Sequence, residues 1–492
     1  MLKCLNIVQC IGQLIQQKGN TRHSNGFSLK QPFQLAIKKN KILLLTCLYL
    51  FCSSCSTTAL FLPYQADQLQ LPNGIDIRFN QLKQRSYKSP ITGKQRAGDD
   101  LENFIIEHIN RAEKEILIAV QEFSLPKIAN ALIAKHRQGI IIKVIIENNY
   151  AQPWSTSHAA GLPGHQQQRI LQLSALADLN RDGVLSADER HNGDAIALLN
   201  TAGVALKNDT ADGSKGSGLM HHKFIVVDGK QVIFGSANFS SSDLHGDANA
   251  PNTRGNANHL FAVKSIAFAN IFKTEFEKLW SNQFGINKKS GPVQEVKIGD
   301  STIQVLFAPH TRDDQNHGIN LIAQTLGQAK QTIDLALFVF SAQNLSEVLE
   351  DKARKGVKIR ALVDPGFANR SYSELHDMMG FSLPDKRCKL EPHNKPWQKP
   401  IYSVGIPKLA AGDKLHHKLA IIDSKVIISG SFNWSPSAAH SNDETLVIIH
   451  SNKLAKHFNR EMERLWAGSR LGITEKLKKK IAKAERFCGK VM

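Results

Sequence analysis

Two stretches of this chain combine histidine, lysine, aspartate and asparagine at matching spacings. The first runs from Leu219 to Ser240 and the second from Lys414 to Ser435. Both contain His-x-Lys-x4-Asp, a short apolar segment, and then Gly-Ser-x-Asn. The shared positions are His221, Lys223, Asp228, Gly235, Ser236 and Asn238 in the first stretch, and His416, Lys418, Asp423, Gly430, Ser431 and Asn433 in the second. One such stretch could be an ordinary hairpin, but two matching copies indicate a site that is built twice.

The spacing of these residues predicts a phosphate site. Side chains two positions apart on a strand point to the same face, so each histidine lies beside the lysine of its own motif. If the two strands meet, two imidazoles, two ammonium groups and two carboxamides surround one cavity. Lysine and asparagine would bind the phosphoryl oxygens, one histidine would attack phosphorus, and the other would protonate the leaving oxygen.

The duplicated pattern resembles the double His-Lys-Asp motif of the phospholipase D superfamily. The resemblance covers roughly residues 75–467 and implies a phosphodiesterase that works through a phosphohistidine, with no cofactor for catalysis. It implies His221 as the nucleophile and His416 as the general acid and later base. The other members divide into expected phosphate ligands, Lys223, Lys418, Asn238 and Asn433, and residues expected to brace the motif, Asp228 and Asp423.

The family also places an acidic residue shortly after Gly-Ser-x-Asn, where it orients the histidine of the opposite motif. Glu444 occupies this position in the second half and would serve His221. The first half has Asn258 instead. A neutral amide would orient His416 but would stabilise its cation less than a carboxylate does. We therefore expect the two halves to differ, in agreement with one nucleophile and one acid.

Strand and helix patterns alternate in the same order in both halves. Strand patterns occur at 75–79, 116–120, 140–146, 303–307, 333–340 and 357–363, and helix patterns at 99–113, 125–138, 319–330 and 345–355. The alternation predicts an α/β fold. With the resemblance, it predicts two phospholipase D-like α/β sandwich domains in tandem, related by a pseudo-twofold axis, with the active site at their interface. Because both motifs lie in one chain, we expect an active monomer.

We divide the chain into five parts by composition and pattern. They are a leader with a signal segment (1–55), a linker with the first strand (56–98), a first domain (99–290), a second domain (291–468) and a basic tail (469–492).

An insertion at about 166–200 makes the first half longer than the second and carries a calcium-loop pattern. Residues 178–189 fit the twelve-residue calcium loop, between helix patterns at 166–177 and 187–200. The expected ligands are Asp178, Asn180, Asp182, the Val184 carbonyl, Ser186 and Glu189. The alternative is an acidic surface turn in which Ser186 caps a helix. A calcium ion here would hold the insertion together and would take no part in catalysis.

The amino-terminal residues predict export from the cytoplasm. A basic segment at 38–41 precedes the apolar run 42–51, which is too short for a comfortable membrane span. Small residues before Cys55 resemble a bacterial lipoprotein cleavage site. The alternatives are a plain signal peptide and an uncleaved anchor. We expect a secreted or cell-envelope protein, with Cys55 as a candidate lipid anchor.

Charge and apolar residues mark two further segments. The formal net charge is +19, and the tail at 469–492 holds eight basic and two acidic residues. This tail has helical spacing and would be either a solvated helix or a contact for anionic lipid or nucleic acid. The segment 372–400 carries Met378, Met379, Phe381 and Trp397. Exposed, they would suit an acyl chain or a bilayer, but we favour a small satellite core.

Cysteine usage argues against a disulfide framework. Five of the seven cysteines lie in the first 55 residues. Only Cys388 and Cys488 lie beyond them, so these two could form at most one bond.

We favour a secreted or lipid-anchored phospholipase D that hydrolyses or transfers a phosphatidyl group. Membrane proximity and the apolar segment at 372–400 support a phospholipid or membrane surface as the partner. The first alternative is a secreted endonuclease of the same superfamily acting on DNA or RNA, supported by basicity and by Phe239 and Trp434 beside the asparagines. A transferase of the cardiolipin synthase type is disfavoured because the sequence shows no multi-span anchor. An inactive calcium-stabilised binding protein is the alternative from another class, and the intact histidines and lysines argue against it.

Overall fold

The computed structural model describes residues 69–157, 160–216 and 218–489. The predicted signal segment and Cys55 lie outside the described residues, so export and lipid modification stay predictions. Within the described ranges, no helix has the length and apolar character needed to cross a membrane. Residues from Leu69 onward form one unit, which contains both motifs.

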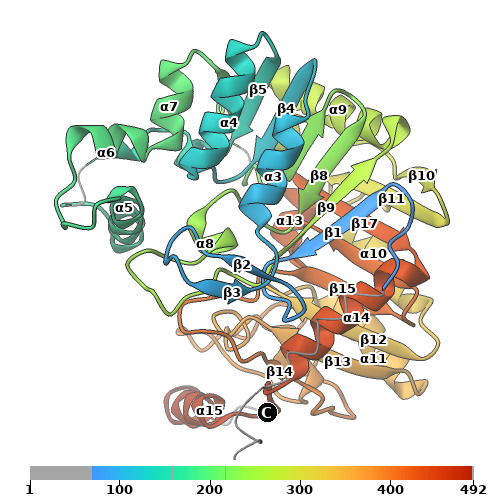
Figure 1. Cartoon of the computed structure of the whole chain (residues 1–492). Helices are drawn as coiled ribbons and strands as arrows, with labels where there is room; N and C mark the ends of the chain where they lie inside the picture. Colours follow the sequence, from blue (N-terminus) through green and yellow to red (C-terminus); the bar gives the residue numbers. More distant parts are fainter. Residues whose placement is uncertain (1–68, 158–159, 217, 490–492) are drawn as a thin grey trace, which may run out of the picture. The chain divides into compact units, whose positions relative to one another are not determined.

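The first half of the chain forms a seven-stranded sheet in the order β1-β9-β8-β7-β4-β5-β6 (Figure 1). Its strands are β1 (Ile75–Phe79), β4 (Glu115–Val120), β5 (Ile141–Ile146), β6 (Ala205–Asn208), β7 (Lys223–Val227), β8 (Gln231–Gly235) and β9 (His259–Lys264). The pairs β4–β5 and β5–β6 are parallel and the others are antiparallel. The helices α3 (Leu101–Asn110), α4 (Pro126–Arg137), α7 (Ala195–Thr201) and α9 (Ile266–Trp280) belong to this half.

The second half forms a nine-stranded sheet in the order β10-β11-β17-β16-β15-β12-β13-β14-β18. Its strands are β10 (Gln294–Ile298), β11 (Ser301–Ala308), β12 (Thr332–Leu337), β13 (Lys358–Val363), β14 (Val404–Ile406), β15 (Lys418–Ile422), β16 (Val426–Gly430), β17 (Glu444–His450) and β18 (Arg470–Leu471). Its main helices are α10 (Gly318–Gly327), α11 (Gln343–Arg354), α13 (Pro436–His440) and α14 (Asn452–Trp466). The run β17-β16-β15-β12-β13-β14 repeats the order β9-β8-β7-β4-β5-β6. The expected α/β architecture is confirmed, whereas the boundaries 99–290 and 291–468 stay predictions.

A shared core joins the two halves. In α9, Phe268, Phe272 and Phe276 recur at helical spacing and are buried. In α14, Phe458 and Met462 do the same. These side chains belong to one apolar cluster together with strands of both sheets. Because β4 and β12 are covered on both faces, every residue after the first is buried in each strand, and apart from Asp334 these buried residues are apolar. The cluster therefore fixes the two halves against each other, and the two motifs, one in each half, can form one site only if the halves are held together.

The remaining strands and helices do not belong to the two large sheets. They are the hairpin β2 (Ser86–Lys88) and β3 (Gln95–Ala97), and the helices α5 (Gly164–Ala177), α6 (Ala187–Asn192), α8 (Ser241–Leu244), α12 (Glu374–Met378) and α15 (Glu475–Cys488). The helix expected at 187–200 is two helices, α6 and α7. It is interrupted because Asp194 caps α7 by accepting hydrogen bonds from the backbone of Ile196 and Ala197.

The segment 372–400 is packed, as we favoured, and the exposed alternative is wrong. Met378, Met379 and Trp397 are buried in the core of the second half, and Phe381 packs against it. The indole N–H of Trp397 donates to Ser346 Oγ at 3.0 Å. The segment thus offers these side chains to no membrane. Cys388 at its tip is disulfide-bonded to Cys488, the one bond that the cysteine count allowed.

Candidate active site

Backbone pairing between the halves brings the two motifs together. Met220 pairs with Asp443 and Ala257 pairs with Leu415, each in a parallel bridge. The backbone N–H of His221 donates to the Asp443 carbonyl at 2.9 Å. In the same way, the N–H of His416 donates to the Ala257 carbonyl at 3.1 Å. Each histidine is therefore held against the segment that enters β17 or β9 of the opposite half.

Each imidazole is oriented from the opposite half through its Nδ1 atom. His221 Nδ1 lies 2.7 Å from Glu444 Oε2, and His416 Nδ1 lies 3.0 Å from Asn258 Oδ1. Carboxylate and carbonyl oxygens accept, so both Nδ1 atoms carry the proton and both Nε2 atoms keep a lone pair. The serine of each Gly-Ser-x-Asn motif fixes the partner: Ser431 Oγ donates to Glu444 at 2.6 Å, and Ser236 Oγ to Asn258 at 2.7 Å.

The two motif lysines are buried. Lys223 is 2% exposed and Lys418 is 1% exposed. Each ammonium group donates to the carbonyl of its own motif histidine, at 2.9 Å from Lys223 and 2.8 Å from Lys418. Among the described residues, neither has a carboxylate oxygen within 4.0 Å, since no salt bridge involves them. Burial of a charge is costly unless a counter-charge is supplied, so this arrangement favours an anionic ligand.

The motif asparagines complete the polar lining. Asn238 Oδ1 accepts a hydrogen bond from the backbone of Glu122 at 3.3 Å, which directs its amide NH2 group away from that strand end. Asn433 Oδ1 is buried without a hydrogen-bond partner among the described groups. Both side chains thus keep hydrogen-bonding capacity beyond the contacts that fix them.

Asp228 and Asp423 lie away from the imidazoles and hold the strand ends. The Asp228 carboxylate accepts hydrogen bonds from the backbone N–H groups of residues 113, 114 and 115, before and at the start of β4. The Asp423 carboxylate accepts from residues 330, 331 and 332, before and at the start of β12. Both aspartates have positive φ, near 54° and 51°. Their contacts are those of the bracing role that the sequence suggests.

Burial dominates the electrostatics of the site. Burial, with the neighbouring Lys223 and Lys418, lowers the pKa of His221 to about 4 despite the opposing effect of Glu444. Burial, followed by the same two lysines, holds the pKa of His416 well below its usual value. Burial also lowers the pKa of Lys223 to about 8, and the pKa of Lys418 well below its usual value. Both imidazoles are therefore neutral at pH 7 before an anion enters.

Asp243 is a site residue that the sequence reasoning missed. Its Oδ1 lies 3.7 Å from His416 Nδ1, and its Oδ2 accepts the backbone N–H of Asn238 at 2.6 Å. The first half therefore has a carboxylate near His416, although Asn258 occupies the family position. A signal was present, because Asp243 is an acid five residues after the motif asparagine.

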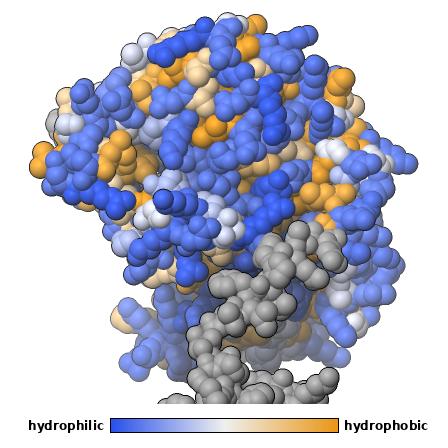
Figure 2. Space-filling view, viewed as in Figure 1, coloured by the Kyte–Doolittle hydropathy of each residue, from blue (hydrophilic) through white to orange (hydrophobic). Residues whose placement is uncertain are grey.

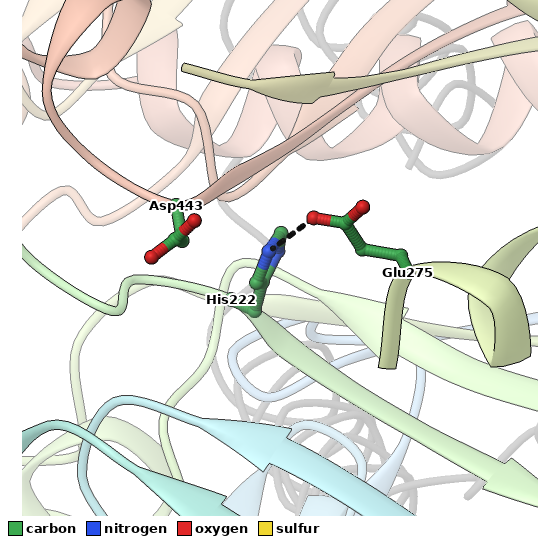
Figure 3. Close-up of side chains that lie close together, drawn as sticks. All are labelled: His222, Glu275 and Asp443. Atoms are coloured by element: carbon green, nitrogen blue, oxygen red, sulfur yellow. Dashed lines mark ion pairs between the residues drawn. The ribbon is translucent and has the colours of Figure 1, made fainter. Parts of the chain in front are cut away.

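A second group that the sequence did not indicate is formed by His222, Glu275 and Asp443 (Figure 3). Ligand atoms of His222, Glu275 and Asp443 lie within 4.8 Å of one another, and all three residues are buried. This donor set could hold a metal ion, but Lys288 already supplies a cation. Its ammonium group is 2.6 Å from Asp443 Oδ1 and also contacts Glu275 and the Ala308 carbonyl. Although burial lowers it, Asp443 and Glu275 raise the pKa of Lys288 above its usual value.

The predicted calcium loop is separate from the motifs. Ser186 caps α6, and the Glu189 carboxylate accepts hydrogen bonds from Ser186, as the helix-cap alternative expects. Gly183 has φ near 78° and donates to Asp178 Oδ2 at 3.0 Å. Asp178 Oδ1, however, is buried without a partner among the described groups. This orphaned oxygen fits a cation, so the ligand set Asp178, Asn180, Asp182, Val184, Ser186 and Glu189 stays a prediction.

The insertion reaches the rim of the site through one ion pair. Arg169 on α5 lies 3.1 Å from Glu122 Oε1. Glu122 in turn donates its backbone N–H to Asn238, as described above. The insertion therefore contacts a residue that positions a motif asparagine, without contributing a motif residue itself.

Comparison with known proteins shows which protein family this chain matches. Residues 105–280 and 322–466 match the family described as cardiolipin synthase, PLD-like domain. A mitochondrial cardiolipin hydrolase from Chlamydomonas reinhardtii is 26% identical over 141 residues, which cover 29% of this chain and 54% of that protein. A phospholipase D from Rickettsia felis is 28% identical over 137 residues, covering 28% of this chain and 58% of that protein. The matches thus span between half and two thirds of these relatives.

One solved structure aligns with most of the chain. The phosphatidylserine synthase of Haemophilus influenzae aligns with 84% of this chain and 95% of its own, at 11% identity and a TM-score of 0.49.

Proposed function

Since the chain belongs to the family of the phospholipase D-like domain of cardiolipin synthase, we propose that it is a phosphodiesterase of the phospholipase D type. The family assignment confirms the resemblance to the superfamily seen in the two motifs. The observation that carries the proposal is the pair of buried lysines without carboxylate partners beside two imidazoles that are held through Nδ1. Such an arrangement suits a phosphodiester anion flanked by a nucleophile and an acid.

The first half-reaction forms a phosphohistidine. The Nε2 lone pair of His221 attacks phosphorus, and the bond from phosphorus to the leaving oxygen breaks. His416 gives its Nε2 proton to that oxygen. Because His416 is neutral in the free site, we infer that the arriving anion offsets the charges of Lys223 and Lys418 and raises the pKa of His416. Glu444 stabilises the positive charge that develops on His221.

The second half-reaction releases the phosphoryl group. His416, now neutral, removes a proton from water or an alcohol, and the resulting oxygen attacks phosphorus. The bond between phosphorus and His221 Nε2 then breaks, which leaves His221 neutral and His416 protonated, as they were in the substrate complex, and His416 loses its proton to solvent when the product anion leaves. In this proposal the chain's own lysines and asparagines supply the positive potential, and no cofactor takes part.

We propose a phosphatidyl group as the substrate. The support is that named relatives of this chain are a cardiolipin hydrolase and a phospholipase D. The four apolar side chains singled out in the segment 372–400 are packed, so they do not favour a bilayer. Phe239 and Trp434 are buried against Phe123 and Phe340, so they offer no surface for stacking bases. A nucleic-acid substrate remains the alternative that the experiment below tests.

We also propose that the protein acts in the cell envelope as a monomer. The location rests on the sequence of residues 38–55, and the monomer on the contribution of both halves to one site within a single chain. Mass spectrometry of the membrane fraction should find lipid on Cys55. A mature protein that begins elsewhere and is free of lipid would reduce the claim to simple secretion.

A substrate panel tests the function. The full chain would be assayed in EDTA on labelled cardiolipin, phosphatidylcholine, plasmid DNA and RNA. We expect turnover of a phospholipid and a loss of at least ~10³-fold in His221→Ala and in His416→Ala. His165→Ala, an exposed histidine on α5, serves as the control and should be unchanged. If the protein cleaves nucleic acid and leaves the phospholipids intact, the proposed substrate is wrong. If His416→Ala retains the normal rate, the two-histidine mechanism is wrong.

A further inference from the structure

The carboxyl-terminal helix α15 carries a basic stripe along one flank. Leu477 is buried, and Ile481 packs against the core of the second half. Three lysines and one phenylalanine are exposed at positions i, i+4, i+7 and i+11, the spacing of a single helical flank. They are Lys476, Lys480, Lys483 and Phe487, called the α15 stripe below. Phe487 is 78% exposed.

The α15 stripe faces the segment that borders the candidate active site. The Lys480 ammonium group donates to the backbone carbonyl of Asn369, in the segment that follows β13. Two residues earlier, the ring of Phe367 lies 4.6 Å from the ring of Phe338. The Phe338 ring lies 4.8 Å from the imidazole of His416. A continuous series of contacts therefore connects the stripe with the general acid.

A disulfide holds the far end of α15 in place. Cys488, in the last turn, is bonded to Cys388, with 5.3 Å between the Cα atoms. Leu390, two residues after Cys388, is 51% exposed, and Phe487 precedes Cys488. The bond therefore joins the two chain segments that carry these exposed apolar side chains, at the end of the row of lysines. A solvated, fraying helix would need no such tether.

We propose that the α15 stripe docks the protein onto an anionic phospholipid surface, an inference that rests on the proposed action on phosphatidyl groups. Lysines near such a surface are attracted to its negative headgroups, and Phe487 and Leu390 fit the boundary between headgroups and acyl chains. The apolar area is small, and apolar residues form only scattered groups on the face drawn in Figure 2. The contact is therefore peripheral, and it presents headgroups to the segment beside His416.

Vesicle binding tests this surface. The full chain, made by cell-free synthesis so that Cys55 stays unmodified, is sedimented with phosphatidylcholine vesicles that contain or lack phosphatidylglycerol. A variant with Lys476→Gln, Lys480→Gln and Lys483→Gln should bind the anionic vesicles roughly 100-fold more weakly, at about five-fold per lysine. The control has the same loss of charge at exposed lysines elsewhere, Lys297→Gln, Lys355→Gln and Lys358→Gln, and should bind as the wild type does.

Two further measurements separate the alternatives. Phe487→Ala should weaken binding several-fold even at high salt, where charge attraction is screened. All variants should retain turnover of a soluble phosphodiester, so loss of docking and loss of function are seen separately. The proposal is overturned if the stripe variant and the control bind vesicles equally. It is also overturned if the stripe variant loses affinity for duplex DNA while its vesicle binding is unchanged.

Discussion

The Nδ1 atom of His221 lies 2.7 Å from Oε2 of Glu444, a residue 223 positions later in the chain. The equivalent relationship in the other direction joins His416 to the amide oxygen of Asn258 at 3.0 Å. The two imidazoles are thus held by the same backbone geometry but by groups of different charge. A carboxylate in hydrogen-bond contact stabilises an adjacent cation more than one that lies 3.7 Å away, as Asp243 Oδ1 does from His416 Nδ1, so His221 is better suited than His416 to bear the positive charge of a phosphohistidine.

Replacing Glu444 with glutamine should show this difference. Because Glu444 raises the pKa of His221 against the effects of burial and of the lysines, its loss should lower that pKa further below about 4. The acidic limb of kcat/KM should therefore move to lower pH, while kcat falls by at least about 10²-fold, since the cation loses its partner. The exposed Glu347→Gln is the control. An acidic limb that moves to higher pH would contradict the assignment.

Replacing Asn258 with aspartate tests the other half. A carboxylate at this position should raise the pKa of His416, which must be protonated to act as the acid. The alkaline limb of the pH profile should therefore move to higher pH. Loss of the hydrogen bond from Asn258 to the Asp243 carbonyl should cost about 1 kcal/mol of stability. Asn459→Asp, on the surface, should leave the profile unchanged, and an unmoved limb in Asn258→Asp would argue against His416 as the acid.

Lys288 should contribute to both stability and rate. Lys288→Met leaves the carboxylates of Asp443 and Glu275 buried without their cation, which should lower the free energy of unfolding by about 3–5 kcal/mol. Because the Asp443 carbonyl holds the backbone of His221, kcat should also fall. Combining it with Asp443→Asn should restore part of the stability, since one unpaired charge is removed.

The control for this change is the adjacent Lys289→Met, which removes an exposed ammonium group. Thermal unfolding and turnover of a soluble phosphodiester give the two readouts. A Lys288→Met protein with the melting temperature of the control would mean that the ion pairs of Lys288 with Glu275 and Asp443, the two carboxylates drawn in Figure 3, do not stabilise the fold.

The residues of the site differ in how far the sequence could predict them. Glu444 could be predicted because it lies shortly after the second Gly-Ser-x-Asn motif, and such local spacing can be read directly from the sequence. Lys288 could not be found. It lies in a segment without strand or helix pattern, and its partner Asp443 is 155 residues away. Such contacts depend on how the two sheets pack, and no local period in the sequence encodes that packing.

The aromatic residues show the same limit. Phe239 and Trp434 follow the motif asparagines, which suggested a surface for stacking, yet both pack inward against Phe123 and Phe340. Position beside a reactive residue does not decide the direction of a side chain, because neighbours along a strand end alternate between faces. The packing of residues 372–400 was predicted correctly, because four large apolar side chains in one loop are costly to expose to water.

The predicted calcium loop gives the last test. It presents the carboxylates of Asp178, Asp182 and Glu189, and Asp178 Oδ1 lacks a partner among the described groups. A cation bound only by the folded chain stabilises it by mass action, by about 2.7 kcal/mol when free calcium is 100 times the dissociation constant. Calcium should therefore raise the melting temperature, and EDTA should lower it. Glu189→Gln should abolish this response, whereas the exposed Glu277→Gln should keep it.

In the same samples, removal of calcium should lower the melting temperature but should leave turnover unchanged. The groups proposed to act on phosphorus are histidines, lysines and asparagines, and the loop is connected to them through α5 and the Arg169–Glu122 ion pair. Initial rates on a soluble phosphodiester should therefore persist in EDTA at temperatures where the protein stays folded. Glu189→Gln should show the same rates, because it leaves the imidazoles and their partners intact. Immediate and complete loss of turnover on chelation, with an unchanged circular dichroism spectrum, would assign the ion to the chemistry instead of to the insertion.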